Sequence, residues 1–350
     1  MPERARESAH PHLSRHTLSG RGRAVAFPAF LLALLAWGCA EAPEQEVLEL
    51  SFGHVGAPGS LFALSADEFA ARVNARLEGE ARVVVYGASQ LGGDEVLLNK
   101  LKLGTVDLAL PSSIMSSRIP EFGIFEMPYL VRDRQHMARI EEEVVWPVLA
   151  PLAEDHGYRI LGVWENGYRH VTNNTRPVRA PDDLAGLKLR TPRGTWRVKL
   201  FQNFGANPVP MAFSEVLIAL RTGVVDGQEN PLAQIHASKL NEVQQYLSLT
   251  EHVYTPAFVT VSPDHWEDLP EHVRAVVEEE ARGLRDFVYE TAKRLDRDLL
   301  VTLADTQITV NWANGDAFQR ASQPIYDEFT TTVELGQELV DRAMRVAGSD

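Results

Sequence analysis

The stretch Ala219-Leu-Arg-Thr-Gly-Val-Val-Asp-Gly-Gln-Glu-Asn-Pro231 holds a helix end, a short strand and the start of another helix. Apolar residues recur at helical spacing over 215–222, and Gly223 then interrupts them. An apolar run predicts a strand over 224–228, and Pro231 begins the next helix. An alternation of helix and strand is typical of a sheet with helical crossovers.

The same alternation extends outward from this stretch in both directions. Upstream of it we expect a strand over 187–190, a helix over 196–204 and a strand over 208–211. The N-terminal half predicts strands over 47–53, 81–86, 106–110 and 159–164, with helices over 61–77, 94–103 and 133–156. The pattern restarts after Trp164 without a linker. This predicts an α/β protein of two lobes, joined by crossing strands, with a ligand cleft at the strand ends.

The C-terminal third carries the most regular pattern. From Leu269 to Leu303, apolar residues fall three or four positions apart, which predicts a helix about 50 Å long, able to span both lobes. A coiled-coil seam is the alternative for this spacing. A strand over 308–312 and a last helix over 317–346 follow.

The N-terminus predicts export. Residues 1–38 carry a net charge of +3 and end in the apolar run Val25–Gly38, about 14 residues, where a membrane span needs about 20. We therefore expect a signal peptide over 1–38 and a polar tether over 39–46. Ala36-Trp-Gly-Cys39 resembles a lipobox, although Ala36 stands where Leu is usual. Cys39 is thus either a lipid anchor or the residue after an ordinary cleavage site.

Charge and missing motifs exclude several function classes. The whole chain carries −14, so the part after residue 38 carries −17, which repels nucleic-acid phosphates. The single cysteine excludes an intrachain disulfide and a cysteine-based zinc site. The phosphate-binding and zinc-protease motifs are missing, and Gly87-Ala-Ser-Gln-Leu-Gly92 is one residue too long for a nucleophile elbow. We expect no enzyme activity, no cofactor and no metal.

Three polar residues stand where predicted strands end. Arg190 ends the strand over 187–190. Arg169 closes the stretch Glu165–Arg169, which follows the apolar strand over 159–164, and Asn230 directly precedes Pro231. Arginine binds carboxylates through two parallel donors, so two arginines near a cleft would make an acid receptor. The alternative is that each arginine pairs with a structural Asp or Glu.

From about residue 48 to 310 the chain resembles the DctP family, the extracytoplasmic solute receptors of tripartite ATP-independent periplasmic (TRAP) transporters. The stretch 219–231 is the most specific match. The others are Ser89-Gln-Leu-Gly-Gly93, Pro120-Glu-Phe-Gly123, Pro128-Tyr129, Glu165-Asn-Gly-Tyr-Arg169, Leu184-Ala-Gly-Leu-Lys-Leu-Arg190, Gly205-Ala-Asn-Pro208, Pro210-Met-Ala-Phe-Ser-Glu-Val216 and Tyr246-Leu-Ser-Leu-Thr250.

The resemblance implies a two-lobed periplasmic-binding-protein fold with hinge strands and a long helix spanning both lobes. Lobe 1 would lie mainly in 47–165 and lobe 2 mainly in 166–228. Residues 229–350 would cross the hinge, complete both lobes and supply the spanning helix over 269–303. The partners implied are a small organic acid and the membrane subunits of the permease.

The resemblance also implies site residues. Arg190 falls on the arginine that clamps the ligand carboxylate, and the other matching positions are Arg169, Asn230 and the pocket-wall aromatic Phe213. His54 and Asp94 match positions that contact the rest of the ligand, although His54 is alternatively a structural residue at a strand end.

The ligand implied is a sugar acid. Sialate-binding members have an acidic residue at the position of Pro111 and an asparagine at that of His54. The pair Gly53-His54 and the stretch 164–167 instead resemble members that bind sugar acids such as hexuronates. A C4-dicarboxylate, or a keto or hydroxy acid, is the alternative ligand. A secreted enzyme acting on a carboxylate is the alternative from another class.

Overall fold

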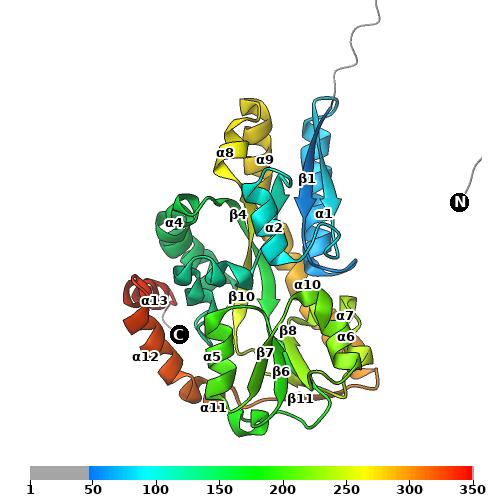
Figure 1. Cartoon of the computed structure of the whole chain (residues 1–350), viewed down its shortest axis with the longest axis vertical. Helices are drawn as coiled ribbons and strands as arrows, with labels where there is room; N and C mark the ends of the chain where they lie inside the picture. Colours follow the sequence, from blue (N-terminus) through cyan, green and yellow to red (C-terminus); the bar gives the residue numbers. More distant parts are fainter. Residues whose placement is uncertain (1–46, 349–350) are drawn as a thin grey trace, which may run out of the picture. The chain divides into compact units, whose positions relative to one another are not determined.

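The computed structural model describes residues 47–348, and the expected signal peptide, tether and Cys39 lie outside them. Two sheets organise this part of the chain (Figure 1). Lobe 1 is built on the strand order β2-β1-β3-β10-β4, and lobe 2 on the order β11-β9-β5-β8-β6-β7. The expected two-lobed α/β architecture is confirmed.

Lobe 1 begins with the expected alternation. Its strands are β1 (Leu48–Gly53), β2 (Ala81–Tyr86), β3 (Leu108–Ala109), β4 (Arg159–Tyr168) and β10 (Tyr254–Val261). The strand β1 pairs in parallel with both β2 and β3, because the helices α1 (Leu61–Arg76) and α2 (Asp94–Lys102) make the crossovers. The rings of Phe52 and Trp164 pack 6.1 Å apart in the core beneath α1.

Lobe 2 contains the stretch that set the pattern. Residues 219–231 end the helix α6 (Val216–Arg221), form the strand β8 (Gly227–Asn230) and lead into α7 (Leu232–Ala237). The strand is therefore shifted toward Asn230 relative to the expected 224–228. The other strands are β5 (His170–Asn173), β6 (Lys188–Thr191), β7 (Asn207–Pro210), β9 (Tyr246–Leu249) and β11 (Thr309–Trp312), and α5 (Thr195–Asn203) connects β6 to β7.

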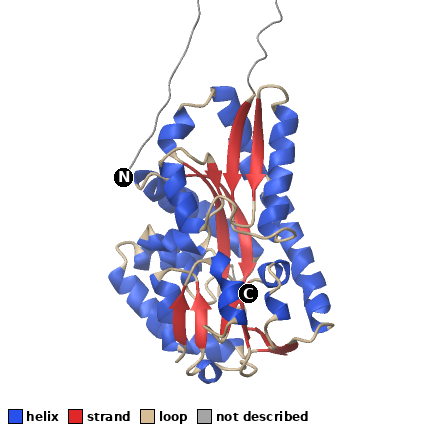
Figure 2. Ribbon diagram, turned by 45° about the vertical axis from the view of Figure 1, so that its right-hand side comes forward, coloured by secondary structure: helices blue, strands red, loops and turns tan. Residues whose placement is uncertain are grey.

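The chain passes between the lobes along neighbouring strands (Figure 2). The strand β4 of lobe 1 continues into β5 of lobe 2, while β9 of lobe 2 leads back into β10 of lobe 1. Near this crossing Gly167 has a φ of +121°, and the β4–β10 register shifts between Thr255 and Pro256. A side chain is strained at such a φ, so glycine lets the chain turn here.

An ion cluster holds the crossing strand against two helices. The guanidinium of Arg134, at the start of α3 (Arg134–Ile140), donates to both carboxylate oxygens of Glu165 on β4, over 2.7 and 2.6 Å. It also donates to Asp296, on the helix α10 (Arg285–Ala304), over 2.6 Å. Glu165 is buried, which raises its pKa to about 7, and the bidentate pairing with Arg134 opposes this rise.

Three of the expected long helices, over 269–303, 317–346 and 133–156, are divided into shorter elements. The span 269–303 is two helices, α9 (Glu271–Gly283) and α10 (Arg285–Ala304). The break is only at Leu284, whose N–H and carbonyl keep bonds of 3.1 and 3.0 Å to Glu280 and Val288. The apolar stripe therefore stays in phase, and it packs on β4 and α1 rather than in a coiled coil.

The other two expected helices are also divided. The span 317–346 is three helices, α11 (Gly315–Ala321), α12 (Gln323–Thr332) and α13 (Gly336–Arg345). The span 133–156 is α3, a π-helix (Glu141–Leu149) containing Pro147, and α4 (Ala150–Asp155). Proline lacks the N–H that a regular helix needs. The remaining elements are η1 (Ser113–Ser117), η2 (Pro120–Glu126), η4 (Pro181–Leu184), η5 (Phe213–Glu215), η6 (Leu240–Glu242) and α8 (Pro263–Glu267). Across residues 47–348, no helix combines the length and apolarity needed to cross a membrane.

Candidate ligand-binding site

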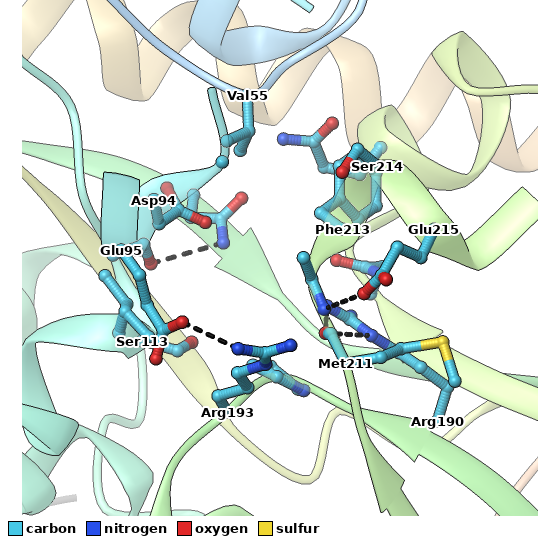
Figure 3. A pocket seen from close by; sticks show the side chains of 18 of the residues that line it. Val55, Asp94, Glu95, Ser113, Arg190, Arg193, Met211, Phe213, Ser214 and Glu215 are labelled. Atoms are coloured by element: carbon cyan, nitrogen blue, oxygen red, sulfur yellow. Dashed lines mark hydrogen bonds and ion pairs between the residues drawn. The ribbon is translucent and has the colours of Figure 1, made fainter. Parts of the chain in front are cut away.

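A cavity of about 330 Å³ is lined by both lobes. Lobe 1 contributes the start of α2 and the segment from Ser112 to Ile114. Lobe 2 contributes β6 and the segment from Met211 to Glu215. In Figure 3, Asp94 and Glu95 lie on one side, and Phe213, Met211 and Arg190 on the other. Five of the six expected ligand-binding residues line this cavity: Asp94, Arg169, Arg190, Phe213 and Asn230.

Arg190 is a buried cation that forms no direct ion pair among residues 47–348, although the charges of Glu229 and Asp94 act on it from a distance. It lies on β6, is 3% exposed, and donates from Nε and Nη2 to the Met211 carbonyl over 3.1 and 2.7 Å. Its guanidinium carbon is 5.8 Å from the centre of the Phe213 ring. Burial lowers the pKa of Arg190 to about 9, so it stays protonated at neutral pH. A buried charge is stable only when paired, so this position calls for an anion.

Arg169 is placed differently, because it has a structural acid partner. Its Nε donates to Glu229 Oε2 over 2.5 Å, and its Nη2 donates to Glu229 Oε1 and Asn230 Oδ1 over 2.8 and 3.1 Å. Arg197 Nη1 donates to the same carboxylate over 2.5 Å. Burial alone would raise the pKa of Glu229, but the two guanidinium groups lower it. The structural pairing considered for both arginines is thus found only at Arg169.

Asp94 brings a carboxyl group into the cavity wall. It is the first residue of α2 and is half-buried. Burial raises its pKa to about 6, and the nearby charge of Arg190 opposes this rise. Asp94 is therefore an acceptor at neutral pH and a donor in mild acid.

Three further polar groups line the cavity and were missed by sequence analysis. They are Ser113 Oγ, Asn166 Oδ1 and Gln234 Oε1, each buried and without a hydrogen-bond partner in the described part of the chain. Unpaired polar atoms in a buried wall indicate a ligand or water that completes their hydrogen bonds. Asn166 belongs to the stretch 165–169, which could have drawn attention to it.

His54 does not line the cavity. Its ring lies against Phe62, with centroids 6.4 Å apart, and Nδ1 accepts a 3.1 Å hydrogen bond from the Gly56 N–H. It is 1% exposed, and burial lowers its pKa to about 4. This arrangement is that of the structural histidine at a strand end, in contrast to the expected ligand contact.

An ion pair that sequence analysis also missed links the lobes across the cavity. Arg193 Nη1, beyond the end of β6, donates to Glu95 Oε2 of α2 over 2.8 Å (Figure 3). The residues lie 98 positions apart, and nothing local in the sequence pairs them.

Comparisons with known proteins agree with this architecture. The model of the family described as bacterial extracellular solute-binding protein, family 7 (DctP) matches residues 52–332. The sialic acid-binding periplasmic protein SiaP of Vibrio cholerae is 32% identical over 295 residues, which cover 84% of this chain and 91% of the relative.

Two solved structures are also similar. The sugar acid binding protein DctPAm from Advenella mimigardefordensis, in complex with galactonate, superimposes with a TM-score of 0.82 at 30% identity, covering 87% of this chain and 98% of that one. A TRAP periplasmic solute-binding protein from Sulfurospirillum deleyianum, with bound succinate, superimposes with a TM-score of 0.81 at 31% identity, covering 85% and 99%.

Proposed function

The chain belongs to bacterial extracellular solute-binding protein family 7, the DctP family, and from that premise we propose that it is a TRAP-transporter receptor for a sugar acid. The receptor captures the acid between its lobes and delivers it to the membrane subunits of the permease. The observation that carries this proposal is Arg190, a buried guanidinium that lines the cavity and forms no direct ion pair within residues 47–348.

Arg190 is the clamp for the ligand carboxylate. A guanidinium has five N–H groups, and the Met211 carbonyl accepts from Nε and Nη2 only. The remaining donors on the two Nη atoms match the two oxygens of a carboxylate. Asn230 and Arg169 lie beside this position in the same cavity wall and complete the anion-binding end.

The rest of the cavity favours a hydroxyl-rich ligand over a C4-dicarboxylate. Ser113, Asn166, Gln234 and Asp94 present oxygen atoms that sugar hydroxyl groups can bond. A second carboxylate would need a second available cation, whereas Arg169 and Arg193 are bound to Glu229 and Glu95. The galactonate-binding relative is therefore the better guide to this ligand than the succinate-binding one.

Binding closes the lobes without making or breaking a bond. A ligand shifts an open–closed equilibrium only through contacts that differ between the two states. Here the ligand touches lobe 1 through Asp94 and Ser113 and lobe 2 through Arg190 and Phe213, so closure completes its contacts. A receptor returns its ligand unchanged, whereas the alternative, a secreted enzyme, would convert it.

The mature receptor works in the periplasm. We propose that it begins at or near Cys39, either held to the membrane by a lipid on this residue or released by ordinary cleavage. N-terminal sequencing and fatty-acid labelling of the wild type and a Cys39→Ser variant distinguish the two forms. A mature chain that retains residues 1–38 contradicts export.

The ligand is identified by denaturing the natively purified protein and analysing the released small molecules by mass spectrometry. A thermal-shift screen of sugar acids and dicarboxylates should then give a few strong hits. A ligand at 100 times its Kd stabilises the folded state by about 2.7 kcal/mol. Hits confined to amines or neutral sugars would overturn the acid-receptor proposal, and conversion of the ligand would overturn the receptor role.

A further inference from the structure

We propose that Glu95 and Arg193 form a specificity-determining pair in which Glu95 occupies an anion site that a second ligand carboxylate would otherwise use. This inference rests on the proposed function, because it explains how a receptor for sugar acids discriminates against diacids. The juxtaposition that carries it is a cation and a carboxylate from opposite lobes, joined at 2.8 Å beside the Arg190 cavity.

The position of Arg193 is that of a second clamp. Arg193 lies three residues beyond Arg190 and lines the same cavity. It also lines an adjoining open groove of about 820 Å³, together with Pro120 and Trp196. Arg193 thus lies between the enclosed cavity and the open groove, where the far end of a ligand held by Arg190 would point.

Glu95 neutralises this second cation. The two side chains are 48% and 37% exposed, so the pair can separate without burying an unpaired charge. A diacid that bound Arg193 would have to displace Glu95. The freed carboxylate would then lie near the ligand's second carboxylate and next to Asp94 in sequence. Like charges at close range are unfavourable, so the intact pair penalises a diacid and leaves a monoacid unaffected.

The pair also joins the two lobes, so its loss should affect the binding of a monoacid and of a diacid differently. An exposed ion pair changes an equilibrium by a factor of about five at most. Loss of Glu95 should therefore weaken binding of a monoacid by no more than about fivefold. The same loss should strengthen binding of a diacid by up to about fivefold, because Arg193 becomes available for an ion pair with the second carboxylate at the same exposed position.

The test compares matched acids by calorimetry. Galactonate and galactarate, and gluconate and glucarate, differ only in a terminal hydroxymethyl group replaced by a carboxylate. Wild type, Glu95→Gln, Arg193→Gln and the double variant are measured, with Glu68→Gln as control. Glu68 pairs with Arg72 on α1 over 2.8 Å at comparable exposure, and neither residue lines the cavity.

We expect wild type to prefer the monoacid of a pair, and Glu95→Gln to reduce that preference by about fivefold. Arg193→Gln and the double variant should show no such gain for the diacid, and Glu68→Gln should match wild type. An unchanged preference in Glu95→Gln overturns the inference. An equal gain in the double variant also overturns it, since the gain would then come from net charge alone. A wild type that binds neither monoacid nor any other sugar acid overturns the proposed function instead.

Discussion

Replacing Arg190 with alanine should abolish tight binding while leaving the ligand-free fold intact. In the ligand-free protein, and within residues 47–348, Arg190 makes hydrogen bonds only to the Met211 carbonyl and forms no direct ion pair. In the complex it pairs with the ligand carboxylate, which closure removes from water. Truncating one partner of a buried, hydrogen-bonded charge pair costs about 2–5 kcal/mol. Affinity should therefore fall by roughly 30-fold to several thousand-fold.

Although Arg190→Ala should weaken ligand binding, it should not lower the stability of the ligand-free protein. Burial lowers the pKa of Arg190 from 12.5 to about 9. Because the pKa is lower in the folded state, the charged side chain disfavours folding at every pH below about 9. Alanine removes this unfavourable term, and the side chain borders a cavity rather than a packed core. We expect Arg190→Ala to unfold at the same or a higher urea concentration than wild type.

Calorimetry with the ligand and urea titration without it measure the two effects. Arg190→Lys should recover part of the affinity, because an ammonium keeps the charge but lacks two parallel donors. Arg82→Ala is the control, since Arg82 pairs with Glu49 over 2.8 Å on the surface of lobe 1. A folded Arg190→Ala variant with wild-type affinity would refute the reasoning and make Arg169 the next candidate for the clamp.

Three further substitutions test the charges and the crossing. Glu229→Gln removes the buried carboxylate of Arg169 and one of the two that pair with Arg197, so it should lower the free energy of unfolding by about 3–5 kcal/mol in urea titration. Because the pKa of Glu229 is lowered in the folded state, this difference should be complete at neutral pH and shrink as pH falls below about 4.5. Equal stability of the variant and wild type at pH 7 would contradict this prediction. The pKa of Asp94 is raised from 3.8 to about 6 in the folded protein, so ionisation of this side chain opposes folding. Asp94→Asn should therefore stabilise the ligand-free protein by about 1–2 kcal/mol above pH 6 and give no gain below pH 4. A gain in stability that does not depend on pH would rule out this cause. Gly167→Ala should lower the free energy of unfolding by about 1–3 kcal/mol, because the φ of Gly167 is +121°. Gly283→Ala is the control and should not destabilise the protein, because its added Cβ meets nothing within 4 Å. Similar stabilities for the two variants would argue against strain at the crossing.

Local patterns predicted the elements and part of the site. The apolar periodicity of 269–303 anticipated the helices that pack on β4, but it could not reveal the break, since one residue at Leu284 leaves the stripe in phase. Arg190 and Asn230 could be found because polar residues at strand ends converge on the cleft of an α/β fold.

The remaining parts of the site depend on contacts between distant residues. Arg169 and Arg190 carry the same side chain at similar predicted positions, yet only the fold brings Glu229 to one of them. Glu95 and Arg193 face each other because the two lobes meet. His54 follows a predicted strand as a ligand residue might, but its ring turns into the protein beside Phe62.

The interleaved strand order has a consequence for biosynthesis and secretion. The strand β10 lies between β3 and β4, so the sheet of lobe 1 remains incomplete until residues 254–261 have been made. At about 5–20 residues per second, the ribosome needs roughly 7 to 30 s to pass from β3 to β10. The sheet of lobe 2 is completed later still, because it includes β11 (Thr309–Trp312). Neither sheet can therefore be completed until most of the chain has been translated, an order that is compatible with the export we propose.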